Sequence, residues 1–139
     1  MTVQTHDLTE SASRSSASRS VRAAWAALGA FLLIGALFEA VKHGGWVIPA
    51  VVAGGLVPDL SFLVDASGPH RPGQLPRGTV RVYNLLHRPI LPIVVMAIPV
   101  ALGAGGTAVP FTFGLAWLAH IALGRAVGYG LRAPDGWQR

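Results

Sequence analysis

Three side chains with the chemistry of metal ligands stand at or within apolar runs of this 139-residue chain: Asp59, His87 and His120. Asp59 follows Pro58 near the end of one apolar run, His87 stands near the start of another, and His120 lies deep within a third. Carboxylate oxygens and neutral imidazole nitrogens bind zinc and related transition metals, and an open coordination position would hold an activated water. These residue types indicate a candidate divalent-metal site.

Further polar residues accompany these three in the sequence. Tyr83 and Asn84 precede His87 by four and three residues, so the three side chains share one helix face. Charged groups cost on the order of 2.5–3.5 kcal/mol at the bilayer centre, so they normally face one another or water. We therefore expect a polar cluster around the metal-ligand candidates, formed by Tyr83, Asn84, Arg88 and Arg125.

The same residues also fit a purely structural role. Asp59 would pair with Arg88 or Arg125, and the histidines would bond to the backbone or to lipid headgroups, so that the cluster clamps neighbouring helices. Arg88, Arg125 and Arg132 are each expected to extend toward lipid headgroups. Clamp and metal site are two open interpretations of one cluster.

The composition indicates a membrane protein that positions these residues. Hydrophobic residues make up 52% of the chain and charged residues only 12%, about half the charged fraction of a typical soluble protein. The absence of cysteine excludes disulfides and thiol nucleophiles. The net charge of +5 could indicate nucleic acid. The basic residues lie beside apolar runs without forming a dense stripe, however, so we expect no nucleic-acid partner.

The order of apolar runs predicts an all-α, polytopic membrane protein with four transmembrane helices. Each run is about long enough to cross a ~30 Å hydrocarbon core. The serine-rich N-terminus has no apolar periodicity and is expected to be disordered. The predicted organisation is a polar tail at 1–22, a transmembrane domain at 23–132 with spans at about 23–41, 46–64, 82–104 and 107–124, and a polar C-terminal tail at 133–139.

The basic residues predict the orientation in the membrane. With four spans, both tails and the loop at 65–81 share one side, which then holds all ten arginines, whereas the opposite side holds only Lys42. The positive-inside rule places the arginine side in the cytoplasm. Many arginines, alanines and glycines suggest a GC-rich bacterial genome, so we expect a multi-pass protein of the bacterial inner (plasma) membrane with both termini cytoplasmic.

Three motifs follow one another along the chain: Pro58-Asp59-Leu-Ser61, Tyr83-Asn84-Leu-Leu-His87-x4-Pro92, and Trp117-Leu-x-His120-Ile-x3-Arg125-x2-Gly128-Tyr129-Gly130-Leu131. In this order they resemble a known family of small bacterial integral membrane proteins, domain of unknown function (DUF) 4260, over about residues 25–132. The resemblance implies a four-helix membrane protein and no established activity. More distantly, the arrangement is similar to membrane-bound proteins labelled metal-dependent hydrolases, which implies Asp59, His87 and His120 as ligands.

One position departs from the pattern that the hydrolase-like proteins imply. They have an aspartate immediately before the arginine, which would pair with the histidine four residues earlier as a second ligand on the same helix. Gly124 stands there in this chain, before Arg125. The substitution leaves Asp59 and two histidines as the candidate ligand set.

Three functions fit these observations. The cluster clamps the helices, or binds a lipid or a protein partner, in a protein without enzymatic activity. Alternatively, the chain is a metal-dependent hydrolase of the membrane surface that uses Asp59, His87 and His120. A small transporter or proton relay is a third reading, and it would need oligomerisation because four short helices enclose little pore. The expected partners are the lipid bilayer and either a second copy of the chain or another membrane protein.

Overall fold

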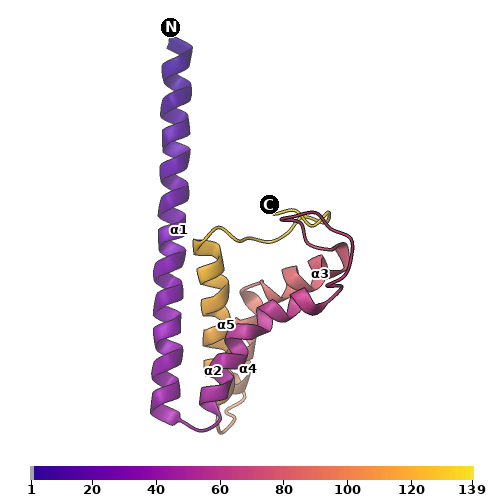
Figure 1. Ribbon diagram of the computed structural model, residues 1–139. Helices are drawn as coiled ribbons and strands as arrows, with labels where there is room; N and C mark the ends of the chain where they lie inside the picture. The colour runs from indigo at the N-terminus through magenta and orange to yellow at the C-terminus, as the bar shows by residue number, and fades with distance from the viewer. Residues whose placement is uncertain (1) are drawn as a thin grey trace.

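The computed structural model describes the backbone of residues 2–139 and the side chains of residue 13 and residues 15–139. Across this part of the chain the structure is helical and contains no strand (Figure 1), which confirms the predicted all-α class. In chain order, the elements are the α-helices and one 3-10 helix, η1: α1 (Thr2–His43), α2 (Val47–Leu56), η1 (Val57–Leu63), α3 (Arg77–Leu86), α4 (Ile90–Ala101) and α5 (Ala108–Ala126).

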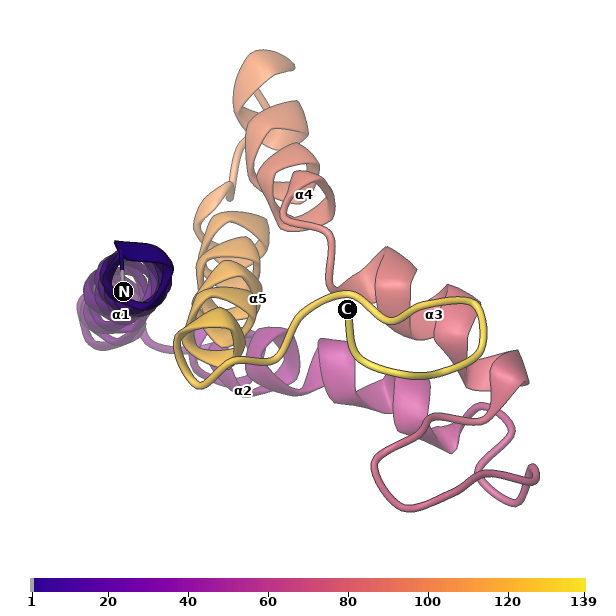
Figure 2. The ribbon, with the colours of Figure 1, turned by 90° about the horizontal axis from the view of Figure 1, so that it is seen from above.

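Helix α5 lies at the centre of the packing, with α1, α2 and α4 around it (Figure 2). The buried core joins Leu32 of α1 to Ala119 and Ala122 of α5. A Cβ atom at Gly54 of α2 would overlap the backbone oxygen of Phe113 in α5. Small residues thus let the helix backbones approach closely, as in the helix interfaces of membrane proteins.

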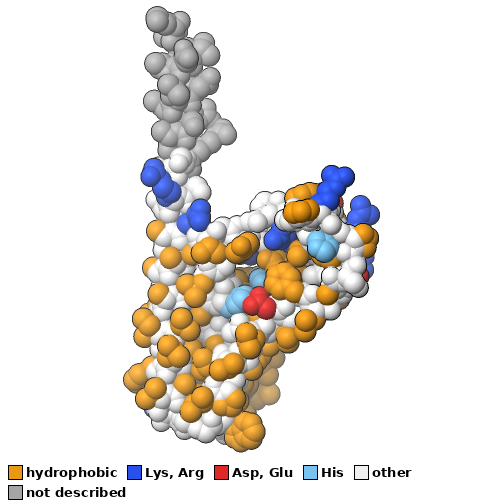
Figure 3. All heavy atoms as spheres, viewed as in Figure 1, with side chains coloured by type: hydrophobic (Ala, Val, Ile, Leu, Met, Phe, Trp, Pro, Cys, Tyr) orange, Lys and Arg blue, Asp and Glu red, His pale blue; other side chains and the backbone are white. Residues whose placement is uncertain are grey.

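The outer surface carries many exposed apolar side chains. On α1, Phe31 is 73% exposed and Val41 is 87% exposed, and hydrophobic side chains cover much of the lower body in Figure 3. Apolar surface of this extent indicates contact with lipid or with another protein.

By length and composition, one helix could cross a membrane, or up to two if a bent pair counts as one span. The first is Ser15–His43 within α1, and the pair is α3 with α4, which meet at a bend of 42°. Of the predicted spans, 23–41 falls inside the first of these. The run 46–64 is a shorter apolar helix broken near Pro58. The α5 run contains the polar residues His120 and Arg125 and is not among the candidate spans. Four spans therefore stay a prediction.

Two helix breaks, which lie side by side, create the geometry of the site. Helix α2 passes into η1 at Val57, directly before Pro58, and α3 ends at Leu86, just before Pro89. Proline lacks the amide hydrogen that a continuous helix needs, so both breaks have a local cause. Because η1 packs against α3, the two breaks bring their polar residues together.

The two predicted tails look different in the structure. Residues 2–22, expected to be disordered, continue α1, and the chain has no glycine or proline before Gly29 that would end the helix; Met1 lies outside the described residues. Residues 133–139 form a turn, with the Ala133 amide bonded to the Trp137 oxygen at 2.8 Å. The turn is held to the loop before α3, because the Leu75 amide donates to the Gly136 oxygen at 3.0 Å.

Candidate metal site

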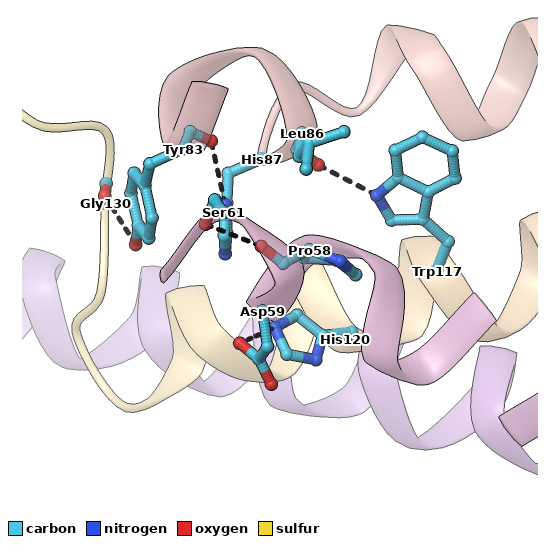
Figure 4. Close-up of polar contacts among 9 residues, drawn as sticks. All are labelled: Pro58, Asp59, Ser61, Tyr83, Leu86, His87, Trp117, His120 and Gly130. Atoms are coloured by element: carbon cyan, nitrogen blue, oxygen red, sulfur yellow. Dashed lines mark hydrogen bonds and ion pairs between the residues drawn. The ribbon is translucent and has the colours of Figure 1, made fainter. Parts of the chain in front are cut away.

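The structure brings Asp59, His87 and His120 together. Each offers one ligand atom, and the three atoms lie within 4.8 Å of one another. Asp59 comes from the first turn of η1, His87 caps the C-terminus of α3, and His120 projects from α5. Figure 4 shows the three side chains converging from these separate elements.

Asp59 and His120 are already spaced like two ligands of one ion. The Nε2 atom of His120 lies 3.5 Å from Oδ1 of Asp59. Bond lengths of about 2.0–2.2 Å in a tetrahedral zinc site place neighbouring ligand atoms about 3.3–3.6 Å apart. A carboxylate and an imidazole at this distance can share an ion without large movement.

His87 is oriented by its own helix. Its Nδ1 lies 2.9 Å from the backbone oxygen of Tyr83, and since a carbonyl only accepts, Nδ1 carries the hydrogen. The other ring nitrogen, Nε2, then has a free lone pair for a ligand. The ring also stacks on the Tyr83 ring, with centroids 3.9 Å apart. Backbone and stacking contacts together fix the direction in which Nε2 points.

Hydrogen bonds to backbone oxygens support the positions of the ligand-bearing segments. Ser61, which is fully buried, donates to the Pro58 oxygen at 2.7 Å and braces the turn that carries Asp59. The indole nitrogen of Trp117 donates to the Leu86 oxygen at 2.8 Å. This bond ties α5 to the end of α3, next to His87.

The predicted polar cluster assembles only in part. Tyr83 contacts His87, and Arg125 lines the same cavity as the three ligand candidates. Asn84 instead bonds to the backbone of Arg132, and Arg88 is exposed and does not line the cavity.

The ion pairs expected for a clamp between Asp59 and an arginine are absent from the described part of the chain, where the Asp59 carboxylate lies beside the His120 ring. Asp65 does not join the cluster either. Its carboxylate lies against Gly78 in the first turn of α3.

A cavity of about 630 Å³, open on one side, adjoins the three ligand candidates. Among its lining residues, Arg132 was expected to extend toward lipid headgroups, but it is only 9% exposed. Tyr129 and Arg132 follow the last helix in an irregular segment, where the sequence has no periodicity. The sequence feature that could have indicated this segment is Gly128, because a glycine is favoured where a helix ends. Its φ of 99° lies in the left-handed region that ends α5. The lining comprises Asp59, Phe62, Tyr83, His87, His120, Ile121, Leu123, Gly124, Arg125, Val127, Tyr129, Gly130 and Arg132.

The site lies at the border between apolar and basic surface. Figure 3 shows histidine and acidic side chains in a hollow, with hydrophobic surface below and basic side chains above. Arg22 marks the same level on α1, because its Nε donates to the oxygen of Ala126 at the end of α5, 2.8 Å away.

Fold and site together define an all-helical, apolar-surfaced protein with an Asp–His–His cluster at paired helix breaks. The model of the family described as "Domain of unknown function (DUF4260)" matches residues 24–139. The chain therefore belongs to this family, as its three motifs predict, and the family description assigns no activity. No curated protein and no solved structure matches the chain.

Proposed function

We propose that the protein is a metal-dependent hydrolase of the membrane surface, which binds a divalent transition metal through Asp59, His87 and His120. The observation that carries the proposal is the approach of the three ligand atoms to within 4.8 Å, at the wall of a half-open cavity. Three protein ligands with an open fourth position are the pattern of catalytic zinc, whereas structural zinc sites are closed by four.

The donor set fits such an ion. One carboxylate and two neutral imidazoles would leave a single positive charge on a bound divalent cation, and the open cavity leaves room for water and a substrate. When bound, the metal would supply a water that ionises near neutral pH and a Lewis acid for the substrate. The chain's own contribution is to hold and orient the ligands, above all through the backbone oxygen of Tyr83, which accepts a hydrogen bond from Nδ1 of His87.

We further propose that the chain is a multi-pass protein of the bacterial plasma membrane, with four spans and the site at the cytoplasmic surface. Basic side chains lie above the site in Figure 3, and Arg22 contacts the end of α5 at the same level, whereas Lys42 lies in the last turn of α1. The positive-inside rule supports a cytoplasmic position for the arginine end.

Reporters fused after Arg139 and inserted between Gly44 and Gly45 would test this topology. The first should read as cytoplasmic and the second as periplasmic, and a periplasmic C-terminus would contradict the topology.

A helix clamp without catalysis is the second candidate. The contact between Asp59 and His120, together with the bond from Trp117 to Leu86, joins η1, α3 and α5 without any ligand. A clamp, however, does not need an open cavity or a free imidazole nitrogen beside the contact, and both are found here.

Metal analysis of protein purified in non-ionic detergent, without chelators, separates the two candidates. The hydrolase proposal predicts stoichiometric metal in the wild type and its loss in His120→Ala. His43→Ala is the matched control, because His43 pairs with Glu39 at the far end of α1, and it should retain the metal. A wild type that stays free of metal even after incubation with zinc, manganese or cobalt would leave only the clamp.

A further inference from the structure

The cavity wall beyond the metal-ligand candidates is positively charged. Arg125 and Arg132, here called the arginine pair, both line the cavity, and Asp59 is the only acidic residue among its described lining residues. Neither arginine forms an ion pair with a carboxylate in the described part of the chain. The cavity therefore carries an excess of positive charge before any metal binds.

Arg132 is fixed in place although its charge is not neutralised. Its backbone amide and oxygen bond to the Asn84 side chain at 2.7 and 2.9 Å, and its Nη1 donates to the Gly73 oxygen at 3.0 Å. Its Nε is buried and has no partner among the described residues, and the whole residue is only 9% exposed. Burial of an unpaired charge is costly, so such an arginine is usually matched by an anion.

Arg125 supplies the second charge from α5. Its guanidinium lies 6.0 Å from the centre of the Trp25 ring. The preceding residue, Gly124, also lines the cavity, and the nearest atom to a Cβ added there would be the Tyr129 Cβ at 4.0 Å. No side chain therefore projects from the cavity wall at position 124, one helical turn beyond His120.

Guanidinium groups bind phosphate through paired hydrogen bonds, and two of them match the two negative charges of a phosphate monoester. We infer that the cavity binds a phosphate monoester, with its phosphate oxygens on the arginine pair and its phosphorus toward Asp59, His87 and His120. The monoester is either the headgroup of a lipid or a soluble ester, and both present the same chemistry. Binding of the phosphate depends on the arginine pair alone, whereas hydrolysis of the ester rests on the proposed function.

The reaction that follows is hydrolysis. A water oxygen bonds to phosphorus, the phosphorus–oxygen bond to the alcohol breaks, and one proton of the water passes to the departing alkoxide. The products are inorganic phosphate and the free alcohol. The arginine pair contributes by holding the phosphate oxygens and the charge that gathers on them in the transition state.

Binding of inorganic phosphate to chelator-treated protein in a non-ionic detergent tests the inference without any metal. Calorimetry should show saturable binding, weakened about tenfold or more in Arg125→Gln and in Arg132→Gln. Arg88→Gln, an exposed arginine outside the cavity, is the matched control and should bind like the wild type. Arg125 is half-buried, so its variant keeps the test valid if the Arg132 variant does not fold.

Competition identifies the source of the phosphate. Micelles containing a lipid with a phosphate-monoester headgroup and a short soluble alkyl phosphate are each titrated against bound phosphate, with a phosphocholine lipid as control. Stronger competition by the first or the second assigns the ligand to lipid or to solute. A dicarboxylate that competes as strongly as the phosphate esters would overturn the choice of phosphate. Equal phosphate binding by wild type and Arg125→Gln would overturn the site. Phosphate binding without any metal binding would instead reject the proposed hydrolase and keep the anion site.

Discussion

The Nδ1 atom of His87 donates to the backbone oxygen of Tyr83, 2.9 Å away, in the last turn of α3. The backbone of the helix thus selects the ring nitrogen that remains free. The same oxygen also accepts a hydrogen bond from the His87 amide at 3.0 Å, so it holds both the backbone and the ring of His87. The contact leaves Nε2 as the ring nitrogen that the proposed metal would bind, beside Asp59 and His120.

Substitution of Tyr83 should separate the effects of its ring from those of its hydroxyl. Tyr83→Phe keeps the ring that stacks on His87 and loses the hydroxyl, which makes a long hydrogen bond to the Gly130 oxygen at 3.3 Å. Its metal affinity should stay within about threefold of the wild type. Tyr83→Ala removes the stacking, and its affinity should fall about 10–100-fold, as for other groups that orient ligands. Titration with zinc against a chromophoric chelator measures both, and equal affinities for the two variants would contradict this role of the ring.

Asp59→Asn should change metal binding far more than it changes the stability of the metal-free protein. The Asp59 side chain is 49% exposed, and exposed ion pairs contribute about 0–1 kcal/mol. Melting of chelator-treated protein in detergent should therefore differ little between the variant and the wild type. Added zinc should raise the melting temperature of the wild type only. A large loss of stability without metal would instead favour the clamp.

Gly124→Asp should strengthen metal binding. A Cβ atom at Gly124 would meet no atom closer than 4.0 Å, and position 124 lies one helical turn beyond His120 on the same face. The added carboxylate would be a fourth ligand, so we expect zinc affinity to rise about tenfold or more. Gly124→Asn is the matched control, with nearly the same shape and no charge. No gain in either variant would show that position 124 does not reach the ion, and an equal gain in both would show that the carboxylate charge is not the cause.

The glycine pair in α2 should respond unequally to alanine. A Cβ at Gly54 would overlap the Phe113 oxygen of α5, whereas a Cβ at Gly55 would meet nothing within 4 Å. Gly54→Ala should cost about 1–3 kcal/mol of unfolding free energy. Gly55→Ala should be neutral or stabilising by up to about 1 kcal/mol, because alanine favours the helix. Thermal or denaturant unfolding in detergent compares them, and equal stability of the two variants would refute the close approach of α2 and α5.

The sequence predicts the helical runs and the residues that meet at the site. Asp59, His87 and His120 converge in the structure, where the sequence predicts a polar cluster around them, and Pro58 and Pro89 stand where the helices break. These features follow from local rules of hydropathy and proline geometry, which a single sequence records directly.

The parts that could not be predicted depend on contacts between distant segments. Asn84 bonds to the Arg132 backbone 48 residues away, and no periodic pattern marks such a pair. The burial of Arg132 and its place in the cavity follow from that contact. The structure continues α1 through residues 2–22, where the serine-rich polar sequence predicts a disordered tail.

The coordination of a bound metal tests the central claim most directly. X-ray absorption at the zinc edge, measured on zinc-loaded protein in detergent, should show nitrogen and oxygen neighbours at about 2.0–2.2 Å and the outer scattering of two imidazole rings. His87→Ala and His120→Ala should each lose one imidazole, and His43→Ala should lose none. A spectrum without imidazole scattering, or one that neither variant changes, would contradict a metal site formed by Asp59, His87 and His120.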